Sequence, residues 1–318
     1  MRCVKRCWRR SQRAMTSFSA IRWPFIGTSC PKRRRKSWFP PCVTPGCPLR
    51  AQMKADPGSS ARAAVLACRE AGRPDGEPLV LLHGFGGSGH SFDPLLDDLG
   101  DRRVILPDLP GQGRSFDVSG SRHPKAGAEA VLATLDSIGC NDFHLCGFSM
   151  GGAVASLIAL KAAERVKSLS LLAPGGFGPE IAAATLRAFG AARDEAAIGD
   201  ALARMVASDT EPPPEDVAAL VQERTNDALV AELTAIAGMI TRDGKQGEIP
   251  RAMLARIACP VHVLWGTADP VLPVSQSRDL PEHFKVRLVE GAGHMLVHEA
   301  AGAALETLAA AQSAAQSR

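Results

Sequence analysis

Apolar and polar positions follow two alternating patterns from about residue 56 to the C-terminus. Six short runs dominated by apolar residues are typical of strands buried on both faces, and they lie at 79–82, 103–106, 143–148, 166–172, 261–265 and 286–289. Helix-like stretches lie between them, at 91–99, 126–138, 151–163, 275–283 and 297–312. Residues 61–71 fit either a helix or an early strand. This alternation predicts an α/β fold with an open, mostly parallel sheet and helices on both faces.

One stretch interrupts the alternation of strands and helices. Residues 177–251 are rich in Ala, Glu and Asp, and four helix-like segments follow one another there, at 181–192, 198–207, 214–223 and 228–240. We therefore expect residues 56–176 and 252–318 to form an α/β core, with residues 177–251 inserted into it as a helical cap.

Residues 1–55 differ in composition from the rest of the chain. They contain 14 lysine and arginine residues and no acidic residue, whereas the remainder has 23 basic and 33 acidic residues. A secretory signal would need an unbroken apolar run, and none follows the basic start. We expect a basic, disordered segment or a translated upstream extension, with Met53 as the true start. A transit peptide, or a contact of residues 32–36 with nucleic acid or an acidic surface, is the alternative.

Composition also narrows the classes of function. No run of 18 or more apolar residues occurs, so we expect no membrane span. The acidic balance after residue 55 argues against nucleic acid as a partner of the core. The cysteines of this part are scattered, as reduced core thiols are, which favours a cytoplasmic location; they are Cys68, Cys140, Cys146 and Cys259. The N-terminal cysteines lack the spacing of a zinc site, so we expect no metal. The oligomeric state stays open.

A serine stands between a strand-like run and a helix-like run. The sequence reads Gly-Phe-Ser-Met-Gly at 147–151, with Ser149 at its centre. This is the setting of a nucleophile elbow, a sharp strand-to-helix turn that exposes the serine hydroxyl. Gly147 and Gly151 would let the strand and the helix pass close to each other. The motif alone is short, so its weight depends on what accompanies it.

A serine needs a base to become a nucleophile, and the base needs a partner that fixes its tautomer. His294 follows the last expected strand, and Asp269 follows the strand before it. Open α/β sheets bind ligands at the carboxyl ends of their strands, where Ser149 also lies. The chain order Ser, Asp, His is the order expected after an elbow serine. We predict Ser149 as nucleophile, His294 as base and Asp269 as the acid that orients it.

A glycine-rich loop follows the first expected strand, with the sequence His-Gly-Phe-Gly-Gly at 83–87. Such a loop can turn backbone N–H groups toward a reacting carbonyl. We predict the amides of Phe85 and Met150 as the two oxyanion donors, and His83 as a brace of the loop. The side chains of Phe85 and Phe148 fit pocket lining and core packing equally well.

Taken together, these motifs resemble the α/β-hydrolase superfamily over about residues 60–312. The matching segments are 83–87, Asp-Leu-Pro-Gly-Gln-Gly-Arg-Ser at 108–115, the serine motif, Trp-Gly-Thr-Ala-Asp-Pro at 265–270 and Gly-Ala-Gly-His at 291–294. The resemblance implies that Asp108 organises its loop. Residues 172–180 are similar to the start of the cap in two subgroups. These are the hydrolase-like domain of acetoin dehydrogenase acyltransferase-type proteins, which is the closer, and the carbon–carbon bond hydrolases of aromatic ring-cleavage products.

The chain departs from both subgroups at identifiable places. Met295 follows the histidine where the carbon–carbon hydrolases usually have tryptophan, and Gln112 stands where relatives often have histidine. Residues 1–60 are too short and too basic to be the lipoyl domain that often precedes the acyltransferase-type proteins. Epoxide and haloalkane hydrolases of this fold use an aspartate nucleophile, so a serine at this position argues against their chemistry.

The resemblance implies a serine hydrolase that needs no cofactor. Its expected substrate is a small ester, thioester or related carbonyl compound with an apolar portion, because a cap would enclose a pocket. One alternative is a carbon–carbon bond hydrolase of ring-cleavage-type diketones. A non-enzymatic alternative is a ligand-binding scaffold on the same fold.

Overall fold

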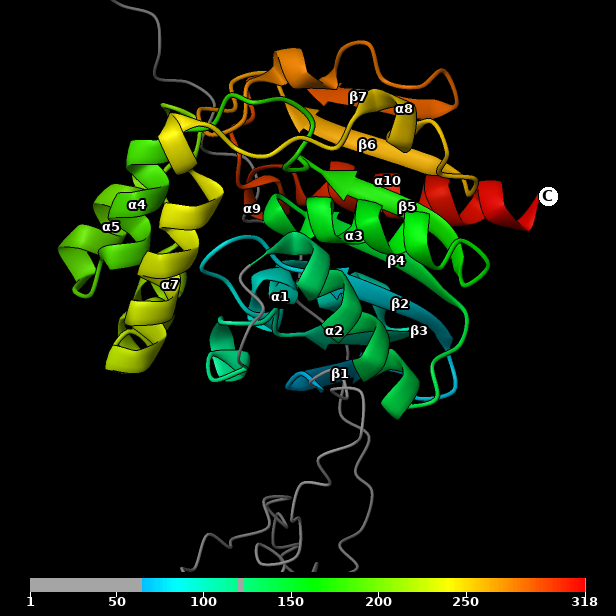
Figure 1. Cartoon of the computed structure of the whole chain (residues 1–318), viewed down its shortest axis with the longest axis horizontal. Coiled ribbons are helices and arrows are strands. Elements are labelled where there is room, and N and C mark those ends of the chain that lie inside the picture. Colours follow the sequence, from blue (N-terminus) through cyan, green and yellow to red (C-terminus); the bar gives the residue numbers. More distant parts are fainter. Residues whose placement is uncertain (1–64, 119–122, 318) are drawn as a thin grey trace, which may run out of the picture. The chain divides into compact units, whose positions relative to one another are not determined.

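A computed structural model of the chain describes residues 65–118 and 123–317. Within these residues, seven strands form one sheet in the order β1-β3-β2-β4-β5-β6-β7 (Figure 1). The strands are β1 Cys68–Gly72, β2 Glu77–Leu82, β3 Arg102–Pro107, β4 Phe143–Phe148, β5 Val166–Leu172, β6 Val261–Gly266 and β7 Phe284–Val289. The extension expected at 1–55 lies outside the described residues. All six expected strands are confirmed, and the ambiguous segment 61–71 contributes the start of β1.

Strand pairing explains why the sequence showed apolar runs. β1 pairs with β3 in antiparallel fashion, and every other neighbouring pair is parallel. Parallel strands in the middle of such a sheet are covered on both faces, and all six residues of β4 are buried. β7 lies at the edge, and its residues 285–288 are exposed. The expected open, mostly parallel sheet is therefore confirmed.

Helices cover both faces of this sheet. Helices α2 and α3 pack against each other, and α3 lies on β4 and β5, whereas α10 lies on the opposite face against β5 and β6 (Figure 1). The α-helices before α4 and after α7 are α1 Asp93–Leu96, α2 Pro124–Ser137, α3 Met150–Lys161, α8 Arg251–Leu254, α9 Leu296–Glu299 and α10 Ala301–Gln316. This layering leaves the carboxyl ends of the central strands free for loops.

The helix expected at 275–283 is wrong. A single 3-10 turn occupies Val274–Ser277, and no helix follows it before β7 begins. Asp279 takes a left-handed φ of 52°, and Pro281 follows two residues later. A left-handed residue cannot continue a right-handed helix, and proline removes a backbone donor, so the segment cannot close helical hydrogen bonds.

Two other expected helices are divided. The stretch 91–99 is a chain of short turns in which only α1 is α-helical. The stretch 297–312 is split at Ala300, whose backbone is not helical (φ −145°, ψ 41°) and separates α9 from α10. The spacing of apolar residues alone does not reveal such breaks, because apolar residues are buried on either side of each break.

Four helices occupy the stretch 177–251, to one side of the sheet (left in Figure 1). They are α4 Ala183–Ala191, α5 Glu195–Ala203, α6 Pro214–Glu223 and α7 Asp227–Ile240, and we call these helices and the loops that join them the cap. Arg224, which is 1% exposed, ties α6 to α4 by donating from Nη1 to the carbonyls of Phe189 and Ala192. Its guanidinium lies over the Phe189 ring, and burial lowers its pKa to about 10.

Charged groups join four strands at the amino end of the sheet, where Nη1 of Arg102 on β3 donates to the Glu77 carboxylate at 2.7 Å. The Glu77 carboxylate on β2 lies 3.0 Å from Nε2 of His144 on β4 and 3.1 Å from Nζ of Lys167 on β5. Nδ1 of His144 lies 2.7 Å from Oγ of Ser168. Burial by itself would raise the pKa of Glu77, but hydrogen bonds with Lys167 and His144 outweigh it and lower the pKa to about 2.

This arrangement predicts an acid-sensitive contribution to stability. A carboxyl whose pKa is lower when folded stabilises the protein above its unfolded pKa of 4.5, and the contribution is lost as the pH falls toward about 2. Glu77→Gln should therefore lower the free energy of unfolding at pH 7, and the deficit should shrink between pH 5 and pH 3. Urea unfolding across this range measures it, with exposed Glu282→Gln as the control. A deficit that stays constant with pH would contradict the assignment.

Candidate active site

Ser149 forms the turn between β4 and α3, in a backbone conformation with φ 52° and ψ −120°. Few residues other than glycine adopt such a φ, and holding one there costs on the order of 1–3 kcal/mol. The surroundings fix it: the Ser149 amide donates to the carbonyl of Leu172, and its own carbonyl accepts from Gly152 and Gly175. The hydroxyl therefore stands clear of the sheet at the amino end of a helix.

Two glycines make this turn possible because other backbone segments lie directly against them. A Cβ on Gly147 would lie 2.4 Å from the carbonyl oxygen of Gly151. A Cβ on Gly151 would lie 2.2 Å from the carbonyl oxygen of Leu82 on β2. Both distances are too short for any side chain, so the close passage expected from the sequence motif is present.

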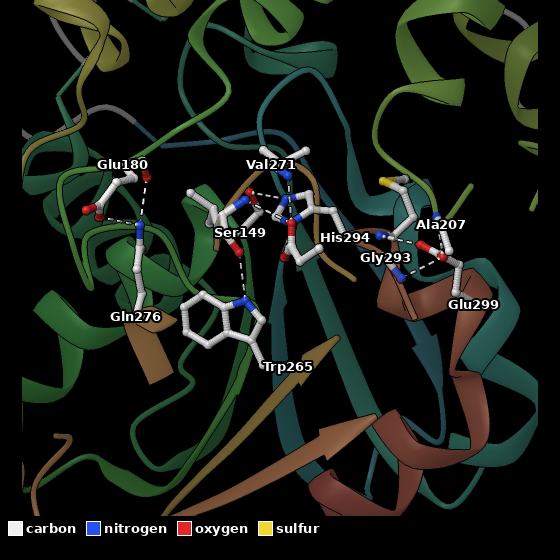
Figure 2. Close-up of polar contacts among 12 residues, drawn as sticks. Ser149, Glu180, Ala207, Trp265, Val271, Gln276, Gly293, His294 and Glu299 are labelled. Atoms are coloured by element: carbon white, nitrogen blue, oxygen red, sulfur yellow. Dashed lines mark hydrogen bonds and ion pairs between the residues drawn. The ribbon is translucent and has the colours of Figure 1, made fainter. Parts of the chain in front are cut away.

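The structure brings Ser149, Asp269 and His294 together, and Figure 2 shows Ser149 beside His294. Nε2 of His294 lies 2.9 Å from Oγ of Ser149, and Nδ1 lies 2.8 Å from Oδ2 of Asp269. The Asp269 side chain is fully buried and that of His294 is 3% exposed. Since the carboxylate accepts from Nδ1–H, Nε2 is left as the acceptor that faces the serine hydroxyl.

The loop after β6 fixes the Asp269 carboxylate. Its other oxygen, Oδ1, accepts hydrogen bonds of 2.8 Å from the backbone N–H groups of Val271 and Leu272. Nε1 of Trp265, a fully buried residue of β6, donates to the carbonyl of Leu272 at 3.0 Å. These backbone bonds, none of which involves His294, therefore hold the carboxylate in its orientation toward the histidine.

Phe85 lines the pocket that holds Ser149, and Met150 follows Ser149 directly in the chain. Among the described residues, neither amide has a recorded hydrogen-bond acceptor, and Met150 is the first residue of α3, whose N–H has no partner within the helix. The neighbouring Gly86 amide, by contrast, donates to Oε1 of the buried Gln112 at 2.6 Å. In the described part of the chain, the Phe85 and Met150 amides therefore differ from the Gly86 amide in having no hydrogen-bond acceptor.

His83 and Asp108 support this loop from below. Nε2 of His83 accepts from the Leu109 amide, so Nδ1 carries the proton and donates to the Gly84 carbonyl. Burial lowers the pKa of His83, which keeps the ring neutral. The Asp108 carboxylate accepts from the amides of Gly89 and Arg114. Burial alone would raise its pKa, but these bonds outweigh burial and lower it.

A pocket opens above Ser149, between the sheet and the cap. The core side contributes Phe85 and Phe148, and the Phe148 ring packs against the His294 ring with centroids 5.1 Å apart. Both phenylalanines are also nearly buried, so they line the pocket and belong to the core at once. The cap side adds Leu186, Phe189, Leu202, Met205 and Leu220. The titratable lining residues are Asp216, Glu223 and three histidines, with no lysine or arginine among them.

Sequence reasoning missed three contributors to this site. Gln112 appeared only as a departure from relatives, yet its side chain holds Gly86 in the loop. Met205 and Glu299 carried no motif, although both contact the loop that bears His294. In the described ranges, no group of three or more histidine, cysteine, aspartate or glutamate side chains is placed to hold a metal ion. No helix there is long and apolar enough to cross a membrane.

Similarity to known proteins agrees with this architecture. The model of the alpha/beta hydrolase family matches residues 79–308. The dihydrolipoyllysine-residue acetyltransferase component of the acetoin cleaving system of Pseudomonas putida is 34% identical over 235 residues, which cover 73% of this chain and 62% of that protein. The 2-hydroxy-6-oxo-6-phenylhexa-2,4-dienoate hydrolase of Burkholderia cepacia is 36% identical over 112 residues, 33% of this chain and 39% of that protein. The chain thus spans less than two thirds of either relative.

Solved structures share the fold at lower identity. The 2-hydroxy-6-oxo-6-phenylhexa-2,4-dienoate hydrolase of Rhodococcus sp. strain RHA1 superposes with a TM-score of 0.66 at 23% identity, covering 77% of this chain and 93% of that one. A carboxylesterase of Bacillus subtilis gives 0.64 at 21% identity, covering 76% and 86%. The resemblance inferred from the motifs is confirmed, and the chain belongs to the alpha/beta hydrolase family.

Proposed function

We propose that this hydrolase cleaves a small ester or thioester through Ser149, His294 and Asp269. The observation that carries the proposal is the position of His294, whose two ring nitrogens lie 2.9 Å from the Ser149 hydroxyl and 2.8 Å from the Asp269 carboxylate. Such an arrangement converts a weakly nucleophilic hydroxyl into an attacking group. The backbone of Ser149 is also strained, and strained residues cluster at functional sites.

The reaction follows from these positions. Nε2 of His294 takes the proton of the Ser149 hydroxyl as Oγ bonds to the substrate carbonyl carbon. Asp269 stabilises the imidazolium that forms. His294 then protonates the departing alcohol or thiol, which leaves an acyl group on Ser149. A water molecule, deprotonated by His294 in turn, releases the acid and restores the hydroxyl.

The amides of Phe85 and Met150 would bind the negative oxygen of the tetrahedral intermediate. Their lack of recorded acceptors supports this role, because a donor that is already paired would have to break a bond first. One such donor contributes about 3–4 kcal/mol to the stability of the transition state. Gln112 and His83 would keep the loop in place while the charge develops.

The pocket supports an uncharged substrate with an apolar acyl portion. Leucine, methionine and phenylalanine side chains dominate its lining, and its acidic side chains, Asp216 and Glu223, offer an anion no favourable partner. The carbon–carbon hydrolase alternative requires a substrate such as the dienoate named for two relatives, whose carboxylate would meet no lysine or arginine in the lining. The apolar lining equally fits a ligand-binding scaffold, so catalysis itself has to be tested.

Removing any triad member should abolish turnover of a neutral ester such as p-nitrophenyl butyrate. Ser149→Ala and His294→Ala should each lower kcat by about 10⁶, and the double variant should lose little more, because the two residues act as one unit. Steady-state kinetics measures this, with exposed Ser275→Ala as a matched control that keeps full activity.

The wild-type outcome separates the candidate functions. Turnover of the ester without turnover of a 2-hydroxy-6-oxo-dienoate supports the proposal, and the reverse pattern favours carbon–carbon hydrolysis. A Ser149→Ala variant within tenfold of the wild type would refute the assigned mechanism. An inactive wild type, correctly folded, would favour the scaffold.

The strain at Ser149 predicts a difference between two inactive variants. Ser149→Gly and Ser149→Ala both lack the hydroxyl, but only glycine adopts a φ of 52° without steric cost. We expect Ser149→Gly to be the more stable by about 1 kcal/mol, since relief of strain exceeds the added entropy of the unfolded chain. Thermal or urea unfolding compares them. If the alanine variant were the more stable, the backbone at this turn would not be strained.

A further inference from the structure

Glu299, the last residue of α9, lies beside the loop that carries His294 (Figure 2). Its Oε2 accepts from the amides of Gly293 and Ala207, each at 2.8 Å, and its Oε1 accepts from the amide of Met295 at 2.9 Å. Gly293 and Met295 are the two neighbours of His294 in the chain. One carboxylate therefore holds the backbone on both sides of the histidine.

The third bond of Glu299 reaches into the cap. Ala207 belongs to the segment that follows α5, and the carbonyl of Met205 in the same segment accepts from the His294 amide at 2.9 Å. A Cβ on Gly293 would lie 2.4 Å from the Ala207 nitrogen, so the two backbones touch without an intervening side chain. The cap and the histidine loop are thus joined at the backbone level.

Chemistry favours a carboxylate at this position. The described residues include no cationic side chain paired with Glu299, so backbone N–H groups provide its recorded bonds. Hydrogen bonds to an ionised acceptor are about twice as strong as neutral ones. Without this acceptor, three loop amides would lose their partners, which is costly where water cannot replace them.

We propose that Glu299 is a positioning residue for His294 and makes its placement depend on the seating of the cap. The inference rests on the proposed function, in which His294 is the base. Met205 extends the link to the substrate, because it lines the pocket and its carbonyl holds the His294 amide. A substrate that fills the pocket would therefore press on the same segment that orients the base.

Glu299→Gln tests the role with little change of shape. Glutamine offers one acceptor oxygen, and in either orientation its amino group faces at least one of the backbone donors. We expect kcat for p-nitrophenyl butyrate to fall at least tenfold, because a misplacement of about 1 Å can cost 10² in rate. KM should stay within about threefold, since no side chain of the pocket lining is replaced. Glu306→Gln on α10, a surface residue paired with Arg287, is the control and should leave both constants unchanged.

A double-variant cycle separates positioning from a general structural role. In the His294→Ala background, Glu299→Gln should not lower the residual rate further, because there is no imidazole left to misplace. Equal losses in both backgrounds, or an unchanged kcat in the single variant, would overturn the proposal. Activity that survives both Ser149→Ala and His294→Ala would instead overturn the proposed function itself.

Two further measurements keep the test decisive. Hydrogen exchange should accelerate at the amides of Ala207, Gly293 and Met295 in Glu299→Gln, while β4 stays protected. If this variant does not fold, Gly293→Ala strains the same junction from the other side, since its Cβ would meet the Ala207 backbone. Gly293→Ala should also lower kcat far more than it raises KM. A folded Gly293→Ala variant with wild-type kcat and KM would contradict the proposed dependence of His294 on the cap.

Discussion

Ser149 is held at a positive φ between β4 and α3, and the arrangement of the site depends on that one turn. The turn exists because Gly147 and Gly151 have no side chain. The backbones of β4 and α3, and that of α3 and the end of β2, can therefore lie directly against each other. That approach also brings the glycine-rich loop after β2 next to the serine. Met150, the first residue of α3, directly follows the serine, and Phe85 of that loop lines the same pocket as Ser149.

The parallel sheet supplies the other half of the site. β6 and β7 run in the same direction as β4, so the loops that carry Asp269 and His294 emerge at the same edge as Ser149. Each loop is then fixed by bonds of its own, Asp269 by two backbone amides and the histidine loop by Glu299 and Met205. The cap borders the apolar pocket above them and is hydrogen-bonded to the loop that carries His294.

Sequence patterns predicted the strands and helices whose limits are set by residues close together in the chain. The runs at 143–148 and 166–172 and the helix at 214–223 have the predicted limits, because burial on both faces and a proline start leave local signatures. The helix at 275–283 was wrong because a left-handed Asp279 cannot be recognised from apolar spacing. Gln112, Met205 and Glu299 escaped prediction because their partners lie far away in the chain or are backbone groups without a motif.

Covalent labelling by a fluorophosphonate tests the central claim most directly, because the reagent reacts with a serine only when base and oxyanion donors act on it together. Peptide mass spectrometry of the labelled protein locates the adduct. The account predicts one adduct, on Ser149, which forms rapidly in the wild type and at least 10³ times more slowly in folded His294→Ala. No adduct on the folded wild type, or an adduct on another serine, would contradict it.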